Sequence, residues 1–294
     1  MSVTLQMDRP TPVPLVFSRA LWKALFRRQG DISTKDLEAI PSLEVLMPSV
    51  TPDPSRLTAF KEVCSCGPSD HLPVAFPETL FLTLMARIVT SSHFPLSPLG
   101  LIHMSQTIES LEPISPDSTL DLRCRLAGRR KTDKGIEIDC ALEVSRSSTL
   151  AWRGTTTFLS RSKATRSGSR RSTRTSEAPA PRATFDLPPD TGRLFAAASS
   201  DYNPHHLTTL TARLIGYKRP IAHGMWTLSR CLSELDSDHD LSAFKIAAAF
   251  KKPIYLPAKV GFWSSNPSDE GSIAFGVHDP KTGAPHLIGT LEPR

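Results

Sequence analysis

The sequence contains no long apolar run. Its longest, FLTLMARIV at residues 81–89, includes Arg87 and is far shorter than the roughly 20 residues that cross a bilayer. We therefore expect no membrane span. The first residues hold Asp8, Arg9 and three prolines where a secretory signal has a continuous apolar core, which favours a cytoplasmic location. Four cations between residues 19 and 28 leave a transit peptide as the alternative.

Cysteine is also scarce, and its spacing is irregular. The five thiols form one C-x-C pair and no second pair, which argues against a disulfide framework and a zinc ribbon: Cys64, Cys66, Cys124, Cys140 and Cys231. No H-E-x-x-H or G-x-S-x-G motif occurs, so a zinc protease or a serine nucleophile at a strand–helix elbow has no support. We expect reduced thiols.

Positive charge is concentrated in one segment. RSKATRSGSRRSTRTSEAPAPR, residues 161–182, holds seven cations and one carboxylate, so it accounts for the whole formal net charge of +6. It has no apolar periodicity, which predicts a flexible basic linker between an N-terminal domain, 1–160, and a C-terminal domain, 183–294. Contact with an anionic partner is the alternative. The segment lacks the interleaved aromatics of a single-strand nucleic-acid platform, so we expect no nucleic acid.

The two parts on either side of this segment resemble each other. Pro73-Val74-Ala75-Phe76 and Pro220-Ile221-Ala222-His223 each precede an apolar helical pattern, at 78–89 and at 224–235. Strand patterns follow in both parts, such as the alternating GIEIDCALEV at 135–144. The sequence therefore predicts an α+β fold made of two repeats, each with one helix and an antiparallel meander. Two unrelated α+β domains are the alternative.

The densest group of reactive side chains lies in SSDYNPHHLTTLTARLIGYKRPIAHGMW, residues 199–226. Asn203-Pro204 is typical of a helix start, which predicts a helix from Pro204 to about Ile215 that ends at Gly216. On such a helix His206 shares an inward face with Leu207, Leu210 and Leu214, and His205 points outward.

The same position sets the expected charges. Asp201 lies just ahead of the helix start, where an anion is favoured, and His206 in the first turn is biased toward the neutral form. An ionised carboxylate beside a neutral imidazole suits the deprotonation of water. A turn aspartate and a hydrogen-bonded core histidine are the simpler alternatives, and a metal site from Asp201, His206 and His223 is a third.

Gly224 follows His223 and opens the next predicted helix, whose first N–H groups have no partner within it. Such groups, at a residue without a side chain, suit an oxyanion that develops on a carbonyl.

SSDYNPHH followed by KRPIAHGMW closely resembles the hydratase-2 motif of the MaoC-like dehydratases, the (R)-specific enoyl-thioester hydratases of hot-dog fold. HLPVAFPETLFLTL and TLAWRG in the first half resemble the inactive first repeat of the double hot-dog 3-hydroxyacyl-thioester dehydratases. The resemblance implies a catalytic pair of Asp201 and His206, a structural role for Asn203 with Pro204 and His223 in support, and thioester binding at Gly224.

Two departures from that motif concern the site. Ser200 replaces the usual glycine before the aspartate, so Asp201 is strained or displaced if this turn needs a positive φ. His205 replaces an aliphatic residue.

The resemblance implies reversible hydration of trans-2-enoyl thioesters, or dehydration of (3R)-hydroxyacyl thioesters, in fatty acyl metabolism, with no metal or organic cofactor. The expected substrate partner is an acyl-CoA or acyl-carrier-protein thioester, and homodimer formation is left open. A hot-dog thioesterase and a non-catalytic acyl-thioester binding protein are the alternatives.

Overall fold

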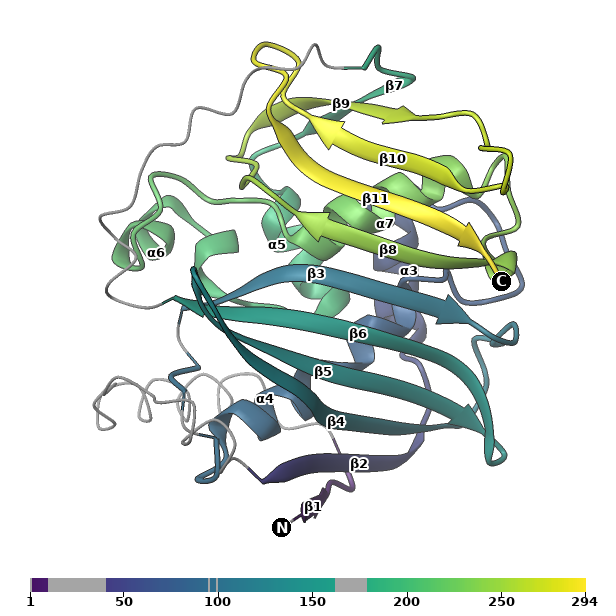
Figure 1. Ribbon diagram of the computed structural model, residues 1–294, viewed down its shortest axis with the longest axis vertical. Helices are drawn as coiled ribbons and strands as arrows, with labels where there is room; N and C mark the ends of the chain where they lie inside the picture. The colour runs from purple at the N-terminus through teal and green to yellow at the C-terminus, as the bar shows by residue number, and fades with distance from the viewer. Residues whose placement is uncertain (1, 10–40, 95, 99, 162–178) are drawn as a thin grey trace.

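The computed structural model describes residues 2–9, 41–94, 96–98, 100–161 and 179–294. One large sheet lies in front of a group of helices in Figure 1. The strands of the first half are β1 (Ser2–Gln6), β2 (Ser42–Val50), β3 (Leu101–Ser110), β4 (Leu120–Thr132), β5 (Gly135–Arg146) and β6 (Thr149–Arg161). Those of the second half are β7 (Ala183–Leu187), β8 (Phe244–Phe250), β9 (Ala258–Ser264), β10 (Ile273–His278) and β11 (Pro285–Pro293).

The strand order shows that one topology occurs twice. The sheet runs β1-β2-β4-β5-β6-β3-β8-β11-β10-β9-β7. Reading outward from the centre, β3-β6-β5-β4-β2 in the first half has the same order as β8-β11-β10-β9-β7 in the second. The predicted α+β class is thus confirmed, and the duplication of the pattern is visible in the topology.

The two halves meet at β3 and β8, which pair antiparallel and make the sheet continuous. Ile108 lies opposite Ile246, and both side chains are fully buried. Within its own half each of these two strands is an edge strand, so this pairing satisfies backbone groups that each half alone leaves open.

A central helix fills the concave side of each half. In the second half α7 (Gly224–Leu235) matches the predicted segment, and its predicted apolar stripe is buried: Met225, Leu228, Leu232 and Leu235. In the first half the predicted helix at 78–89 is two pieces, the 3-10 helix η1 (Phe76–Phe81) and α4 (Leu82–Thr90). Every residue of η1 is buried, as expected of a helix that a curved sheet surrounds.

Two further helices pack against each other across the halves. They are α3 (Pro54–Cys64) and α5 (Thr191–Ser199), with the Phe60 and Phe195 rings 5.9 Å apart. Trp226 of α7 donates its indole N–H to the Val63 carbonyl of α3 at 2.9 Å. The helices therefore tie the two halves together beneath the sheet.

Among the helices that the structure describes, none has the length and apolar character to cross a membrane. Most of the predicted basic linker, residues 162–178, lies outside the described residues. The division into 1–160, 161–182 and 183–294 stays a prediction.

Candidate active site

A left-handed turn at the end of α5 positions Asp201. Ser200 caps this helix with φ 65° and ψ 12°, and its N–H donates to the Ala196 carbonyl at 2.8 Å. This is the conformation that glycine adopts most easily, and here a serine holds it. The turn therefore does need a positive φ, and Asp201 is the residue directly after the strained Ser200.

Asn203 fixes the carboxylate of Asp201. Oδ1 accepts hydrogen bonds from the Asn203 backbone N–H at 3.1 Å and from the Asn203 Nδ2 at 2.6 Å. The Asn203 side chain makes no capping bond to the following turn, so it differs from the expected helix cap. Asn203 therefore orients the Asp201 carboxyl through Oδ1. The other oxygen of Asp201, Oδ2, lies on the side of the histidines.

The predicted helix from Pro204 to Ile215 is wrong. The chain forms a 3-10 turn, η3 (Pro204–His206), and then a separate short helix, α6 (Thr209–Leu214). The break arises because Thr208 caps α6 in a reciprocal capping box with Thr211. Gly216 does end the segment with φ 93°.

His206 points inward as predicted, but for a different reason. It is 6% exposed, whereas Leu210 and Leu214 are 71% and 77% exposed, so no shared apolar face exists. His206 is buried because η3 packs on α5, where a Cβ on Gly192 would collide with the His206 carbonyl.

One hydrogen bond sets the tautomer of His206. Its Nδ1 lies 2.7 Å from the Ile221 carbonyl, and because a carbonyl only accepts, Nδ1 carries the proton. The Nε2 of the neutral ring is then an acceptor. Burial lowers the pKa of His206 well below its ordinary value, and the imidazoles of His223 and His205 lower it further. His206 is therefore neutral near pH 7, as a base requires.

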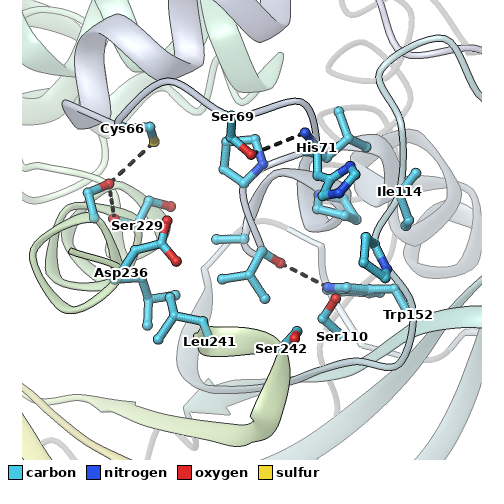
Figure 2. Close-up of a pocket in the computed structure, with 18 of the residues that line it drawn as sticks. Cys66, Ser69, His71, Ser110, Ile114, Trp152, Ser229, Asp236, Leu241 and Ser242 are labelled. Atoms are coloured by element: carbon cyan, nitrogen blue, oxygen red, sulfur yellow. Dashed lines mark hydrogen bonds between the residues drawn. The ribbon is translucent and has the colours of Figure 1, made fainter. Parts of the chain in front are cut away.

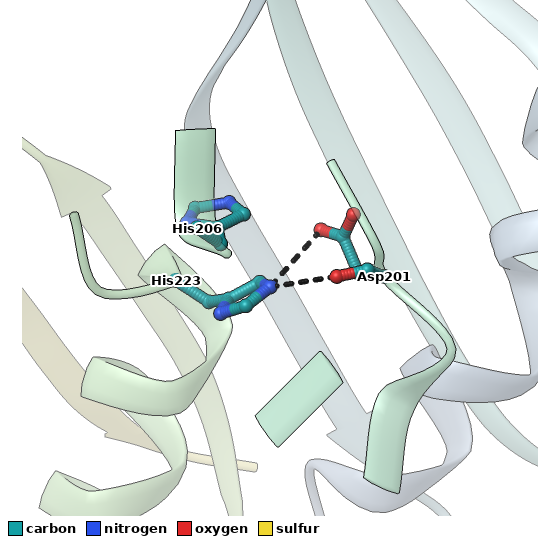
Figure 3. A group of neighbouring side chains, drawn as sticks. All are labelled: Asp201, His206 and His223. Atoms are coloured by element: carbon teal, nitrogen blue, oxygen red, sulfur yellow. Dashed lines mark hydrogen bonds and ion pairs between the residues drawn. The ribbon is translucent and has the colours of Figure 1, made fainter. Parts of the chain in front are cut away.

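His223 completes the group, as Figure 3 shows. Its Nε2 lies 2.9 Å from the Asp201 carbonyl oxygen and 3.8 Å from Oδ2, and its ring stacks on His206 with centroids 3.5 Å apart. Burial lowers the pKa of His223 to about 3, so the imidazole is neutral. Within the described chain, its buried Nδ1 has no hydrogen-bond partner.

Asp201, His206 and His223 offer ligand atoms that all lie within 4.8 Å of one another. The Nε2 of His223 already donates to the Asp201 carbonyl, so on this ring only Nδ1 is left as a possible metal ligand. A water molecule needs only two partners, such as Oδ2 and the Nε2 of His206. The Oδ2 of Asp201 and the Nε2 of His206 can therefore hold a water molecule without breaking the hydrogen bonds that fix the group.

Gly224 is the first residue of α7, next to this group. A Cβ there would meet the Phe250 ring at 3.0 Å, so the glycine allows β8 to approach the helix start. Thioester binding by the Gly224 N–H stays a prediction.

His205 lies beside His206, with ring centroids 4.0 Å apart, and 5.4 Å from the Tyr217 ring. Burial lowers its pKa, and the Asp201 carboxylate opposes this shift. The outward, solvated position predicted for His205 is thus only partly right, because the ring is half-buried.

Two titratable residues of the first half face the same carboxylate and were not singled out from the sequence. Burial raises the pKa of Glu78 to about 8, and Asp201 raises it further. Burial lowers the pKa of His103 to about 4, against an opposing effect of Asp201. A glutamate inside the apolar run FPETLF was the one local signal for the first of them.

Comparisons with known proteins find similarity to a MaoC-like domain and to a dehydratase. Residues 168–263 match the MaoC-like domain. Over 256 residues the chain is 27% identical to 3-hydroxyacyl-thioester dehydratase X of Mycobacterium tuberculosis, a match that covers 86% of this chain and 90% of that protein.

Solved structures of a protein named HtdX and of a MaoC-like dehydratase are also similar to this chain. The crystal structure of HtdX from Mycobacterium tuberculosis has a TM-score of 0.75 at 26% identity and covers 85% of this chain and 100% of its own. That of a MaoC-like dehydratase from Phytophthora capsici has a TM-score of 0.67 at 15% identity, with 90% and 98% covered. With the repeated strand order, these likenesses confirm the predicted double hot-dog fold.

Proposed function

We propose that this chain, which contains a match to the MaoC-like domain, is a hydro-lyase that reversibly hydrates trans-2-enoyl thioesters. In the other direction it dehydrates (3R)-hydroxyacyl thioesters. The observation that supports the assignment best is the approach of a fixed carboxylate to a neutral imidazole of fixed tautomer, Asp201 and His206.

In the proposed mechanism one water molecule lies between Oδ2 of Asp201 and Nε2 of His206. One O–H bond of the water breaks while its oxygen bonds to C3 of the enoyl group, and a proton is delivered to C2. Asp201 and His206 share the removal and the delivery of these protons. The Gly224 N–H stabilises negative charge that develops on the thioester oxygen.

The first half supplies a wall of the site in this proposal. Glu78 is 8% exposed and, with its pKa near 8, is uncharged at neutral pH. His103 is uncharged too, so the first half places two uncharged groups near the Asp201 carboxyl. An uncharged surrounding strengthens the interaction between one carboxylate and the developing charges.

Purified Asp201→Asn and His206→Ala variants should each lose hydration of a crotonyl thioester by about 100-fold or more, because each removes one of the proton-transferring groups. The loss of the enoyl absorbance measures the rate. The matched controls Asp186→Asn and His71→Ala change exposed residues outside the group and should retain activity. Activity near wild type in a folded Asp201 or His206 variant would refute the mechanism.

The same assay separates the two alternative functions. A thioesterase would release free thiol, which a thiol reagent detects while the enoyl group persists. A non-catalytic acyl-thioester binding protein would bind the thioester with no turnover. Comparing CoA with carrier-protein thioesters over a range of acyl lengths, and recording product stereochemistry, then identifies the substrate.

A further inference from the structure

A cavity lies away from the Asp201 group, at the other end of α7. It has a volume of about 300 Å³, which is the lower end of the range for small-molecule sites. The chain after α3 and before η1 forms one wall, and the last two turns of α7 form another (Figure 2). Residues 240–242, just before β8, complete the enclosure.

This cavity occupies, in the first repeat, the place that the candidate active site occupies in the second. Helix α3 ends on Ser65 with φ 54°, as α5 ends on Ser200 with φ 65°. Cys66 then stands where Asp201 stands, and five residues further on His71 stands where His206 stands. Both Cys66 and His71 line the cavity.

The segments that follow correspond as well. The Pro73 segment lines the cavity just before η1, as the Pro220 segment precedes α7. Each segment also bonds to the backbone of the Pro-Ile segment further along its own repeat, Leu72 N–H to the Ile114 carbonyl at 2.8 Å and Ala222 N–H to the Ile254 carbonyl at 2.9 Å, although at different positions of the two segments. The helix that lines the cavity beside these first-repeat segments is α7, which comes from the opposite repeat.

The counterpart has lost the chemistry of the second repeat. The Cys66 Sγ lies 3.3 Å from the Ser233 Oγ, and burial raises the pKa of the thiol, so it is uncharged. Phe76, fully buried, replaces the equivalent of His223. His71 is exposed and has no carboxylate beside it in the equivalent position. The Asp–His pair of the second repeat is therefore absent from the equivalent positions of the first, which hold Cys66 and His71.

The lining limits what the cavity can hold. Its apolar surface includes Leu72, Ile114 and Leu232, and its polar surface includes serine hydroxyls, His71 and the carboxyls of Asp236 and Asp240. No lysine or arginine is among the described residues that line it, so an anionic head group would meet carboxylates without a compensating cation. A neutral acyl chain with an amide-containing arm matches this surface.

We infer that this cavity is a second, non-catalytic binding site for a short, neutral acyl thioester. The ligand class rests on the proposed function, because it is the class that the equivalent site in the second repeat is proposed to convert. The site itself rests on the repeated geometry and on the cavity.

The test uses the full chain and butanoyl-pantetheine, a saturated thioester that cannot be hydrated and lacks the phosphates of coenzyme A. Titration calorimetry should give two sites per wild-type chain. Ser233→Phe and Ser242→Phe, each of which fills the cavity from a different wall, should give one site with crotonyl-thioester turnover unchanged. Ser237→Phe, an exposed position one residue past Asp236, is the matched control and should retain two.

A second measurement keeps the inference testable if a cavity variant fails to fold. Cys66 is the one partly accessible thiol, because the other four are buried. Saturating butanoyl-pantetheine should slow its alkylation by N-ethylmaleimide severalfold in the wild-type chain, as mass spectrometry of the Cys66 peptide can show.

The inference is overturned if the wild-type chain binds one probe and Cys66 is not protected. That result combined with normal turnover leaves the proposed function standing. Two sites and a protected Cys66 without turnover refute the proposed function and support the second site as a binding site.

Discussion

At the scale of single residues, Ser200 combines a strained backbone with a critical position. A non-glycine residue in the left-handed region costs about 1–2 kcal/mol. Ser200 holds φ 65° directly before the carboxylate that we propose as catalytic. The strain therefore acts on the segment that presents Asp201.

Ser200→Gly should raise the free energy of unfolding by about 1 kcal/mol, because glycine adopts this φ without steric strain. Urea denaturation measures the change, and hydration activity should be retained. Ser65→Gly is the matched control, since Ser65 caps α3 with φ 54° and should give a similar gain. A loss of stability in both variants would show that the serines make compensating interactions.

The sequence predicted much of the site at this scale. Asp201, His206 and His223 were singled out from a spacing that resembles a known motif, and the structure brings their side chains together. Glu78 and His103 were not singled out from the sequence. Their place near Asp201 depends on contacts between distant segments, which no local pattern contains.

At the scale of elements, the packing of η3 on α5 sets the depth of His206. Gly192 in α5 leaves no room for a Cβ against the His206 carbonyl. The position of a proposed catalytic side chain thus depends on a glycine fourteen residues earlier in the sequence.

Gly192→Ala should reduce kcat by about tenfold or more, because it pushes η3 away from α5 and displaces the imidazole from Asp201. The steady-state rate with a crotonyl thioester tests this. Gly67→Ala is the matched control, since nothing lies within 4 Å of a Cβ there. Equal rates in the two variants would mean that η3 adapts without moving His206.

Element boundaries were predicted unevenly. The apolar stripe of α7 defined that helix correctly, because its four leucine and methionine positions repeat at helical spacing. The break between η3 and α6 was missed because the Thr208–Thr211 capping box is a local signal that the Asn-Pro start obscured.

At the scale of the whole molecule, buried histidines and a buried glutamate have opposite effects on how stability depends on pH. The pKa of His103 falls to about 4 and that of His223 to about 3, and that of His206 is also lowered. Below about pH 6.5 the unfolded chain binds protons that these native histidines do not, so stability falls as the pH falls. Glu78 has the opposite effect on stability. The native state retains its proton up to about pH 8 and the unfolded chain does not, so stability falls as the pH rises.

Stability should therefore be greatest near pH 6.5 and decline on both sides, as urea denaturation at several pH values can show. From pH 6.5 to 8 the decline should be up to about 1.4 kcal/mol per pH unit, from Glu78. Glu78→Gln should remove this alkaline decline and leave the acid one. An unchanged alkaline decline in that variant would assign it to another group.

The repeat itself was visible in the sequence, but the way its copies join was not. Matching Pro-aliphatic-Ala segments and strand patterns indicated a duplication. The pairing of β3 with β8 joins strands from opposite repeats, and alternation along a strand does not identify its neighbour.

The two repeats that pair through β3 and β8 lie in one chain, and this has an evolutionary consequence. In a symmetric dimer of identical chains, every substitution appears at both sites at once. Here the equivalent positions are encoded separately, so Cys66 and Phe76 could diverge while Asp201 and His223 stayed as they are. A fused pair can thus specialise one half for chemistry and release the other for a different task.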